Sequence, residues 1–213
     1  MNTHRLVRHR LVRRFATILI GVLAASLAVT PVFGATARIE RSRHVKVTGK
    51  ALPMSDHVGD SSDPAIGMKV PTISGQGFDG STVTFASDGK PRLVLFLAHW
   101  CPHCQAEVPR IVKLAKQGKL TGVEIDAVTT NTDKTFPNYP PSKWLKREHW
   151  PFTPVLADDS KGRALAAFGG NAFPFFVLVG ADGTVAARES GEIAPSDIVK
   201  VVKRLVAGTS VFH

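Results

Sequence analysis

The chain has 213 residues, of which 44% are hydrophobic and 21% are charged, and its formal net charge is +10. This length and composition indicate one globular domain with an attachment and argue against a disordered protein. The charge is uneven, because residues 1–50 hold ten Lys and Arg against one acid, whereas the rest hold 17 against 16. The domain is therefore close to neutral, so its charge does not favour nucleic-acid binding, which needs a basic patch on the fold.

The first 37 residues have the pattern of a targeting segment. A positive stretch, residues 5–14, precedes an apolar run over residues 15–29, and Ala35 and Ala37 offer a cleavage site. Residues 15–33 could instead stay as a membrane anchor, since a bilayer needs about 20 such residues. A signal peptide and an N-terminal anchor both remain open for residues 1–37. Either one predicts a domain outside the cytoplasm, membrane-anchored or secreted, where disulfides persist.

Residues 38–63 are predicted to form a linker. They show no lasting hydrophobic periodicity and become rich in Asp, Ser, Gly and Pro. Their basic first part could lie on anionic lipid, although simple solvation is the plainer interpretation. The folded domain is then expected over residues 64–208.

The domain opens with a predicted β-hairpin. Asp79 and Gly80 form a turn signal, and apolar residues alternate at Val83 and Phe85 after it. The next run, residues 93–98, is apolar at every position. Such a run is typical of a strand in a sheet that is covered by helices on both faces.

Both cysteines of the chain, Cys101 and Cys104, follow this strand directly. A buried strand that delivers a Cys-x-x-Cys turn onto a helix is the sequence pattern of a thioredoxin-like redox site. The helix N-terminus favours negative charge on the first sulfur. We therefore expect Cys101 to be the attacking thiolate and Cys104 to resolve the mixed disulfide. Pro102 suits the first helical turn, and His103, if protonated, would add positive charge nearby.

Helices and strands then alternate to the end of the domain. Helices are expected over 102–117, 142–148, 161–168 and 195–206, and strands over 123–128, 155–157, 173–179 and 184–188. This order predicts an α/β fold with a partly parallel sheet that closes in an antiparallel hairpin. The Pro-rich loop 131–141 is long for a connection and is a candidate functional segment. Ser142 is predicted to cap the helix that follows it.

Other uses of the cysteine pair fit the sequence less well. A structural disulfide across two residues would constrain the unfolded chain little. A structural zinc site needs about four ligands, and only His99 and His103 accompany the two thiols here. Peroxide reduction of the peroxiredoxin type is not expected, because the Pro and Thr of the P-x-x-x-T-x-x-C pattern are replaced by Val94 and Ala98.

About residues 70–205 resemble the thioredoxin superfamily, and within it the TlpA/ResA-like thiol-disulfide oxidoreductases. The motif W-C-x-x-C-x-x-E-x-P of that branch runs from Trp100 to Pro109. The resemblance implies a thioredoxin-like fold, with a central mixed sheet flanked by helices and an N-terminal β-hairpin. It also implies that Pro174, which follows Phe173 at the start of a strand, is cis and faces the cysteine pair.

The same resemblance implies the roles of the site residues. Glu107 matches an acid that lies near the cysteines in this branch, and we expect it to tune the pair and to shuttle a proton for Cys104. A solvated helix carboxylate is the alternative for Glu107. Leu95 stands where ordinary thioredoxins carry a buried Asp. The catalytic set is thus Cys101, Cys104, Glu107 and Pro174, and the expected client-binding residues are Trp100, Pro102, His103 and Phe173.

We expect an extracytoplasmic thiol-disulfide oxidoreductase that acts on cysteine-containing protein clients and uses only the Cys101–Cys104 disulfide as its redox group. The branch favours a reductase, whereas the Pro-His dipeptide, which DsbA shares, favours an oxidase. A membrane or extracytoplasmic partner would reset the pair, nucleic acid is not an expected partner, and a monomer is assumed. The alternative is a copper-delivery module that holds Cu(I) through the two thiolates and a nearby His, without the support of a Met/His-rich tract.

Overall fold

The computed structural model describes residues 38–211, so the expected signal peptide or anchor over residues 1–37 lies outside the described residues. The described chain forms a sheet with the strands β1 (Lys46–Thr48), β2 (Thr72–Gly77), β3 (Thr82–Phe85), β4 (Arg92–Leu97), β5 (Glu124–Thr129), β6 (Leu156–Ala157), β7 (Phe175–Val179) and β8 (Val185–Ser190). Its helices are α1 (Pro102–Lys116), α2 (Pro141–Arg147), α3 (Arg163–Ala167) and α4 (Pro195–Val206). None of these helices is long and apolar enough to cross a membrane.

The sheet is mixed, as the alternation of strands and helices predicts. Its strand order is β1-β2-β6-β5-β4-β7-β8, with β3 paired to β2 beside this path. The central strands β4, β5 and β6 run parallel, while β7 and β8 are antiparallel to their neighbours. β2 and β3 pair antiparallel across the turn that contains Asp79 and Gly80. The predicted α/β class is therefore confirmed.

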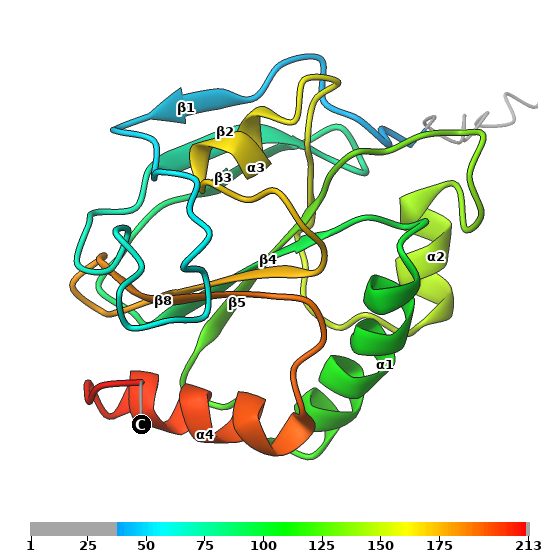
Figure 1. The fold of residues 1–213 in the computed structure, drawn as a ribbon. Coiled ribbons are helices and arrows are strands. Elements are labelled where there is room, and N and C mark those ends of the chain that lie inside the picture. Colours follow the sequence, from blue (N-terminus) through cyan, green and yellow to red (C-terminus); the bar gives the residue numbers. More distant parts are fainter. Residues whose placement is uncertain (1–37, 212–213) are drawn as a thin grey trace, which may run out of the picture. The chain divides into compact units, whose positions relative to one another are not determined.

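The two faces of the sheet carry separate hydrophobic cores. Because side chains alternate along a strand, β4 serves both of them. Leu93, Leu95 and Leu97 pack with α1 and α4, whereas Val94 and Phe96 pack with α3 on the opposite face. Figure 1 shows α1 and α4 together on one side of the sheet and α3 beside β1. This double burial explains why the strand is apolar at every position.

The prediction of a linker over residues 38–63 is wrong, because this segment is packed into the domain. It contains β1, in which Lys46 pairs with Ser74 of β2. Val45 and Leu52 are only 1% and 3% exposed and belong to the same core as α3. Since α3 has five residues, it covers little of its face of the sheet, and the N-terminal segment completes that cover. An irregular segment buries its side chains without a period, so no periodic signal marks it.

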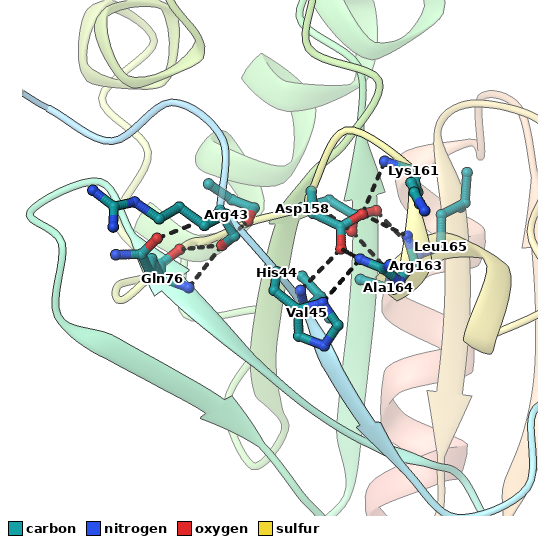
Figure 2. Close-up of polar contacts among 12 residues, drawn as sticks. Arg43, His44, Val45, Gln76, Asp158, Lys161, Arg163, Ala164 and Leu165 are labelled. Atoms are coloured by element: carbon teal, nitrogen blue, oxygen red, sulfur yellow. Dashed lines mark hydrogen bonds and ion pairs between the residues drawn. The ribbon is translucent and has the colours of Figure 1, made fainter.

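Polar contacts fasten the start of this segment to the loop before α3. The Val45 N–H donates to Asp159 Oδ2 at 2.9 Å, and the Arg163 guanidinium donates to the same oxygen at 2.5 Å. Figure 2 shows Val45 and Arg163 close together, with Arg43 beside Gln76. The Arg43 N–H donates to Gln76 Oε1 at 3.3 Å. The Arg43 contact uses its backbone N–H, and Arg43, Lys46 and Lys50 are themselves exposed, as the interpretation of simple solvation expects. The segment is therefore held by its backbone and its apolar side chains.

A second anchor is the buried ion pair between Asp63 and Arg188 of β8. Arg188 donates to both Asp63 oxygens, at 2.8 and 2.6 Å, and both side chains are inaccessible to solvent. It also donates to the carbonyl oxygens of Pro53 and Phe168, at 2.8 and 3.0 Å. Burial raises the pKa of Asp63, but the Arg188 hydrogen bonds outweigh it and hold that pKa below its ordinary value. This end of the segment is thus fixed to the sheet as well.

The cap of α2 also differs from the prediction. Pro140 occupies the N-cap position, and Ser142 lies inside the helix. The Ser142 N–H donates to the Glu40 carboxylate at 2.9 Å, and its hydroxyl donates to the other oxygen of that group. Because the first N–H groups of a helix have no partner within the helix, Glu40 does from a distance what the local serine was expected to do.

Candidate active site

The cysteine pair lies where β4 passes into α1. Cys101 is the N-cap residue of α1, with extended backbone angles (φ −74°, ψ 122°), and Pro102 occupies the first helical turn. Cys104 follows within that turn and is fully buried, while Cys101 is 6% exposed. Both cysteines are free thiols in the structure. Any partner sulfur must therefore approach Cys101 first.

The two sulfurs have different surroundings. Cys101 Sγ lies 3.6 Å from the carbonyl oxygen of Phe173, toward which it can donate. Cys104 Sγ accepts from the Ala98 N–H at 3.4 Å. Burial raises the pKa of Cys104 far above its ordinary value, and the negative charges of Cys101 and Glu107 add to the rise. Cys104 therefore remains a protonated thiol at neutral pH until a base takes its proton.

Pro174 lies beside the pair, as the resemblance implies. The Phe173–Pro174 peptide is cis, and the contact between Phe173 and Cys101 joins residues 72 positions apart. The sequence did not predict the two other cis prolines, Pro140 and Pro154. Phe173 and Pro174 thus lie next to the sulfur that a client would reach.

Glu107 is fully buried on α1, so the alternative of a solvated carboxylate is wrong. Its Oε2 accepts from the Arg110 guanidinium at 3.2 Å, whereas no described residue donates a hydrogen bond to its Oε1. Burial raises the pKa of Glu107, and Arg110 and the Ile193 N–H oppose the rise. The group is a buried carboxylate with a free acceptor oxygen, one helical turn from Cys104.

His103 is exposed and belongs to a chain of charged groups that sequence reasoning missed. Its Nδ1 lies 2.8 Å from Oε1 of Glu192, and Oε2 of Glu192 accepts from Arg110 at 2.6 Å. Arg110 in turn contacts Glu107. Arg110 could have been found from its spacing of three residues from Glu107 on a helix. Glu192 lies 89 residues from His103, so no local signal points to it.

Trp100 forms an aromatic rim next to Cys101. Its ring centroid lies 5.5 Å from that of Phe136 and 6.0 Å from that of Phe173. The indole N–H donates to the Asn131 carbonyl at 2.8 Å, which ties the rim to the loop 131–141. Phe136 is 49% exposed. The loop that the sequence singled out thus places an exposed aromatic residue beside the cysteine pair.

His99 anchors the same loop and was considered in the sequence only as a possible metal ligand. Its Nδ1 lies 2.7 Å from the Pro137 carbonyl, and its Nε2 lies 3.2 Å from the Asp133 N–H. These partners require a neutral ring that donates from Nδ1 and accepts at Nε2. Burial lowers the pKa of His99, which favours this neutral form. His99 is therefore a structural residue that fixes the loop.

A metal site finds little support in this geometry. Among residues 38–211, no three or more His, Cys, Asp and Glu side chains are grouped so that they could hold a metal ion. His103 contacts Glu192, and His99 contacts the backbone of the loop. Within the described part of the chain, the copper-delivery alternative would have to depend on the two thiols.

Comparison with known proteins supports a redox site. Soluble secreted antigen MPT53 of Mycobacterium tuberculosis is 27% identical over 175 residues, which are 82% of this chain and 84% of that protein. Thiol:disulfide interchange protein CycY of Rhizobium leguminosarum is also 27% identical over 175 residues, covering 81% and 83%. A match to probable nucleoredoxin 1 of Arabidopsis thaliana, 27% identical over 119 residues, spans 55% of this chain and only 20% of that longer protein.

Solved structures also indicate a thioredoxin-type exchange protein. A thiol:disulfide interchange protein of the thioredoxin family from Chlorobium tepidum superposes with a TM-score of 0.53 at 26% identity, covering 65% of this chain and 95% of that one. The model of the Redoxin family matches residues 65–203. The chain therefore belongs to the Redoxin family and is a TlpA/ResA-like, thioredoxin-type thiol-disulfide oxidoreductase.

Proposed function

We propose that the protein exchanges disulfides with cysteine-containing protein clients outside the cytoplasm, through Cys101 and Cys104. The observation that carries this proposal is the asymmetry of the pair. Cys101 is the N-cap residue of α1, keeps 6% of its surface exposed and faces the Phe173 carbonyl, whereas Cys104 is fully buried behind it. One sulfur is placed to meet a client, and the other is reached only from within the protein.

Client reduction would proceed in two displacements. The Cys101 thiolate attacks one sulfur of the client disulfide, the client S–S bond breaks, and the second client sulfur leaves as a thiolate. Cys104 then loses its proton and attacks Cys101 Sγ, which forms the Cys101–Cys104 disulfide and releases the first client sulfur. Two electrons pass from the protein dithiol to the client. Client oxidation is the reverse sequence, with the oxidised pair attacked by a client thiolate.

Glu107 is the base that we assign to the second step. Cys104 is inaccessible to water and its pKa is raised, so a buried acceptor must take its proton. Glu107 has an acceptor oxygen without a hydrogen-bond partner in the described chain. The raised pKa of Glu107 makes it a stronger base than an exposed carboxylate. The proton then passes to the client thiolate that leaves.

The client would bind over the aromatic rim and the Phe173–Pro174 turn. Trp100, Phe136 and Phe173 offer apolar contact beside Cys101. The backbone at Phe173 would pair with an extended client chain through strand-like hydrogen bonds. Pro102 and His103 flank the same sulfur on α1. The similarity to MPT53, a soluble secreted antigen, and the pattern of residues 1–37 support a location outside the cytoplasm, where a membrane or extracytoplasmic partner would reset the pair.

The first test is trapping of the client intermediate. The full-length protein with Cys104→Ser is mixed with a peptide that contains a disulfide, and Cys101→Ser serves as the matched control. We expect a mixed disulfide with the Cys104→Ser variant and none with Cys101→Ser, by mass spectrometry. Equal trapping by both variants, or by neither, would contradict the proposed roles.

The second test is the reduction potential of the wild-type pair in glutathione buffers. A value near −120 mV, about that of DsbA, would indicate a disulfide donor. A value near about −270 mV, that of thioredoxin, would indicate a reductase. If the pair does not titrate reversibly between dithiol and disulfide, the proposed exchange is wrong.

A further inference from the structure

We infer that Glu192 is a positioning residue that sets the redox potential of the Cys101–Cys104 pair through its contacts with His103 and Arg110. This inference depends on the proposed function, because it concerns the equilibrium of the same dithiol. Glu192 follows β8 in the chain and is distant in sequence from both cysteines. Its contacts bring a negative charge to the helix turn that carries them.

Both oxygens of the Glu192 carboxylate are committed to α1. Oε1 lies 2.8 Å from Nδ1 of His103, the residue between Pro102 and Cys104, and Oε2 lies 2.6 Å from the Arg110 guanidinium. The hydrogen bonds of His103 and then of Arg110 lower the pKa of Glu192, so the group is ionised at neutral pH. The carboxylate thereby fixes the orientation of the imidazole and offsets part of the charge of Arg110.

The short segment 191–193 touches the site at three places. The Gly191 N–H donates to the Pro174 carbonyl at 2.9 Å, which fixes the segment to the cis-proline turn. Glu192 contacts His103 and Arg110, and the Ile193 N–H lowers the pKa of the buried Glu107 carboxyl group. Three successive residues therefore meet the cis-proline turn, the first turn of α1 and the buried carboxylate. This convergence distinguishes Glu192 from an ordinary surface acid.

The charged groups around Glu192 define the direction of its effect. His103, Glu107 and Arg110 face it from α1, while Glu189 of β8 and Asp197 of α4 line the same hollow of about 350 Å³. Glu192 is thus the acid in direct contact with both His103 and Arg110. Without its charge, the Arg110 guanidinium would be less compensated, and Nδ1 of His103 would lose its charged partner. Positive charge near the N-terminus of α1 favours a thiolate on Cys101, so the reduced form would gain stability and the pair would become more oxidising.

The test is the reduction potential of the full-length protein with Glu192→Gln, measured against glutathione. Glu192 is one-third exposed, so solvent weakens its interactions. We expect the equilibrium constant to change about fivefold, which is ~20 mV toward a more oxidising potential. Glu192→Asp, which keeps the charge, should recover most of the wild-type value. Glu124→Gln is the matched control, since it removes an exposed carboxylate that pairs with Lys90 at the opposite end of β5.

A double variant tests the route through His103. If the inference holds, Glu192→Gln shifts the potential less in a His103→Gln background than in the wild type. His103 is exposed, so this background should fold normally, which thermal unfolding checks. An unchanged potential in folded Glu192→Gln, within about 5 mV, overturns the inference. An equal shift in both backgrounds overturns the route through His103, and failure of the wild type to titrate overturns the proposed function instead.

Discussion

Replacing Asp63 by Ala should destabilise the domain severely, because it leaves the Arg188 charge buried without its counterion. The guanidinium would lose two hydrogen bonds, of 2.8 and 2.6 Å, and keep only those to the Pro53 and Phe168 carbonyl oxygens. Both side chains of the pair are inaccessible to solvent, so water cannot replace the carboxylate without opening the fold. Breaking one side of such a pair costs about 3–5 kcal/mol.

This loss is large compared with the stability of an ordinary domain, which is about 5–15 kcal/mol. For a domain of this size it corresponds to a fall of about 6–20 °C in the melting temperature. The assay is urea unfolding followed by circular dichroism, with thermal unfolding beside it. Asp60→Ala is the matched control in the same segment, because Asp60 is exposed and accepts a local hydrogen bond from the Ser62 N–H. It should change the free energy of unfolding far less than Asp63→Ala does.

The pH dependence gives an independent check on Asp63. Its pKa is lowered in the folded state, so its contribution is present above the unfolded value of about 3.9 and is lost as the pH falls through the folded pKa. In the Asp63→Ala variant this acid-sensitive part of the stability should disappear. If Asp63→Ala unfolds like Asp60→Ala, residues 38–63 do not pack against β8 as described, and the reasoning is refuted.

Three further substitutions test the site and its supports. Glu107→Gln keeps the buried volume but removes the base. Decay of the mixed disulfide should therefore slow about 100-fold, while the first attack by Cys101 changes little. Stopped-flow measurements that show equal slowing of both steps would contradict the role of Glu107 as the base. His99→Phe should expose the loop 131–141 to proteolysis and lower the free energy of unfolding by about 2 kcal/mol. The folded protein holds this histidine neutral, so the wild type loses stability as the pH falls below about 6.5. The variant should not show this loss. Gly169→Ala should cost about 2 kcal/mol or more in urea unfolding, since its φ is +69° and a Cβ would lie 2.4 Å from the Pro53 carbonyl oxygen. Gly89 has a φ of +85° and open space around it, so Gly89→Ala should lose only the stability that the strained backbone costs. An equal loss of stability in Gly169→Ala and Gly89→Ala would contradict the close packing of Pro53 against Gly169.

The sequence predicted the core of the redox site because its signals are local. The apolar run before Cys101 corresponds to β4, and the Pro102 start of α1 and the full range of α4 agree with the prediction. The cis Phe173–Pro174 peptide and its approach to Cys101 followed only from the resemblance, because a contact between residues 72 positions apart has no local pattern. The helix pattern could not predict the burial of Glu107, since the burial of a helix face depends on which distant elements pack against it.

By itself, the sequence determined the order of strands and helices from β2 onward, the α/β class and the position of the cysteine pair at a helix N-terminus, since period, capping and Cys-x-x-Cys spacing act between near neighbours. Only the tertiary structure decided that residues 38–63 belong to the domain, that Asp63 pairs with Arg188 and that Glu192 reaches His103. The last two contacts join residues 125 and 89 positions apart. Such pairings depend on the three-dimensional packing of the whole chain, so the charges that surround the cysteines became visible only in the folded molecule.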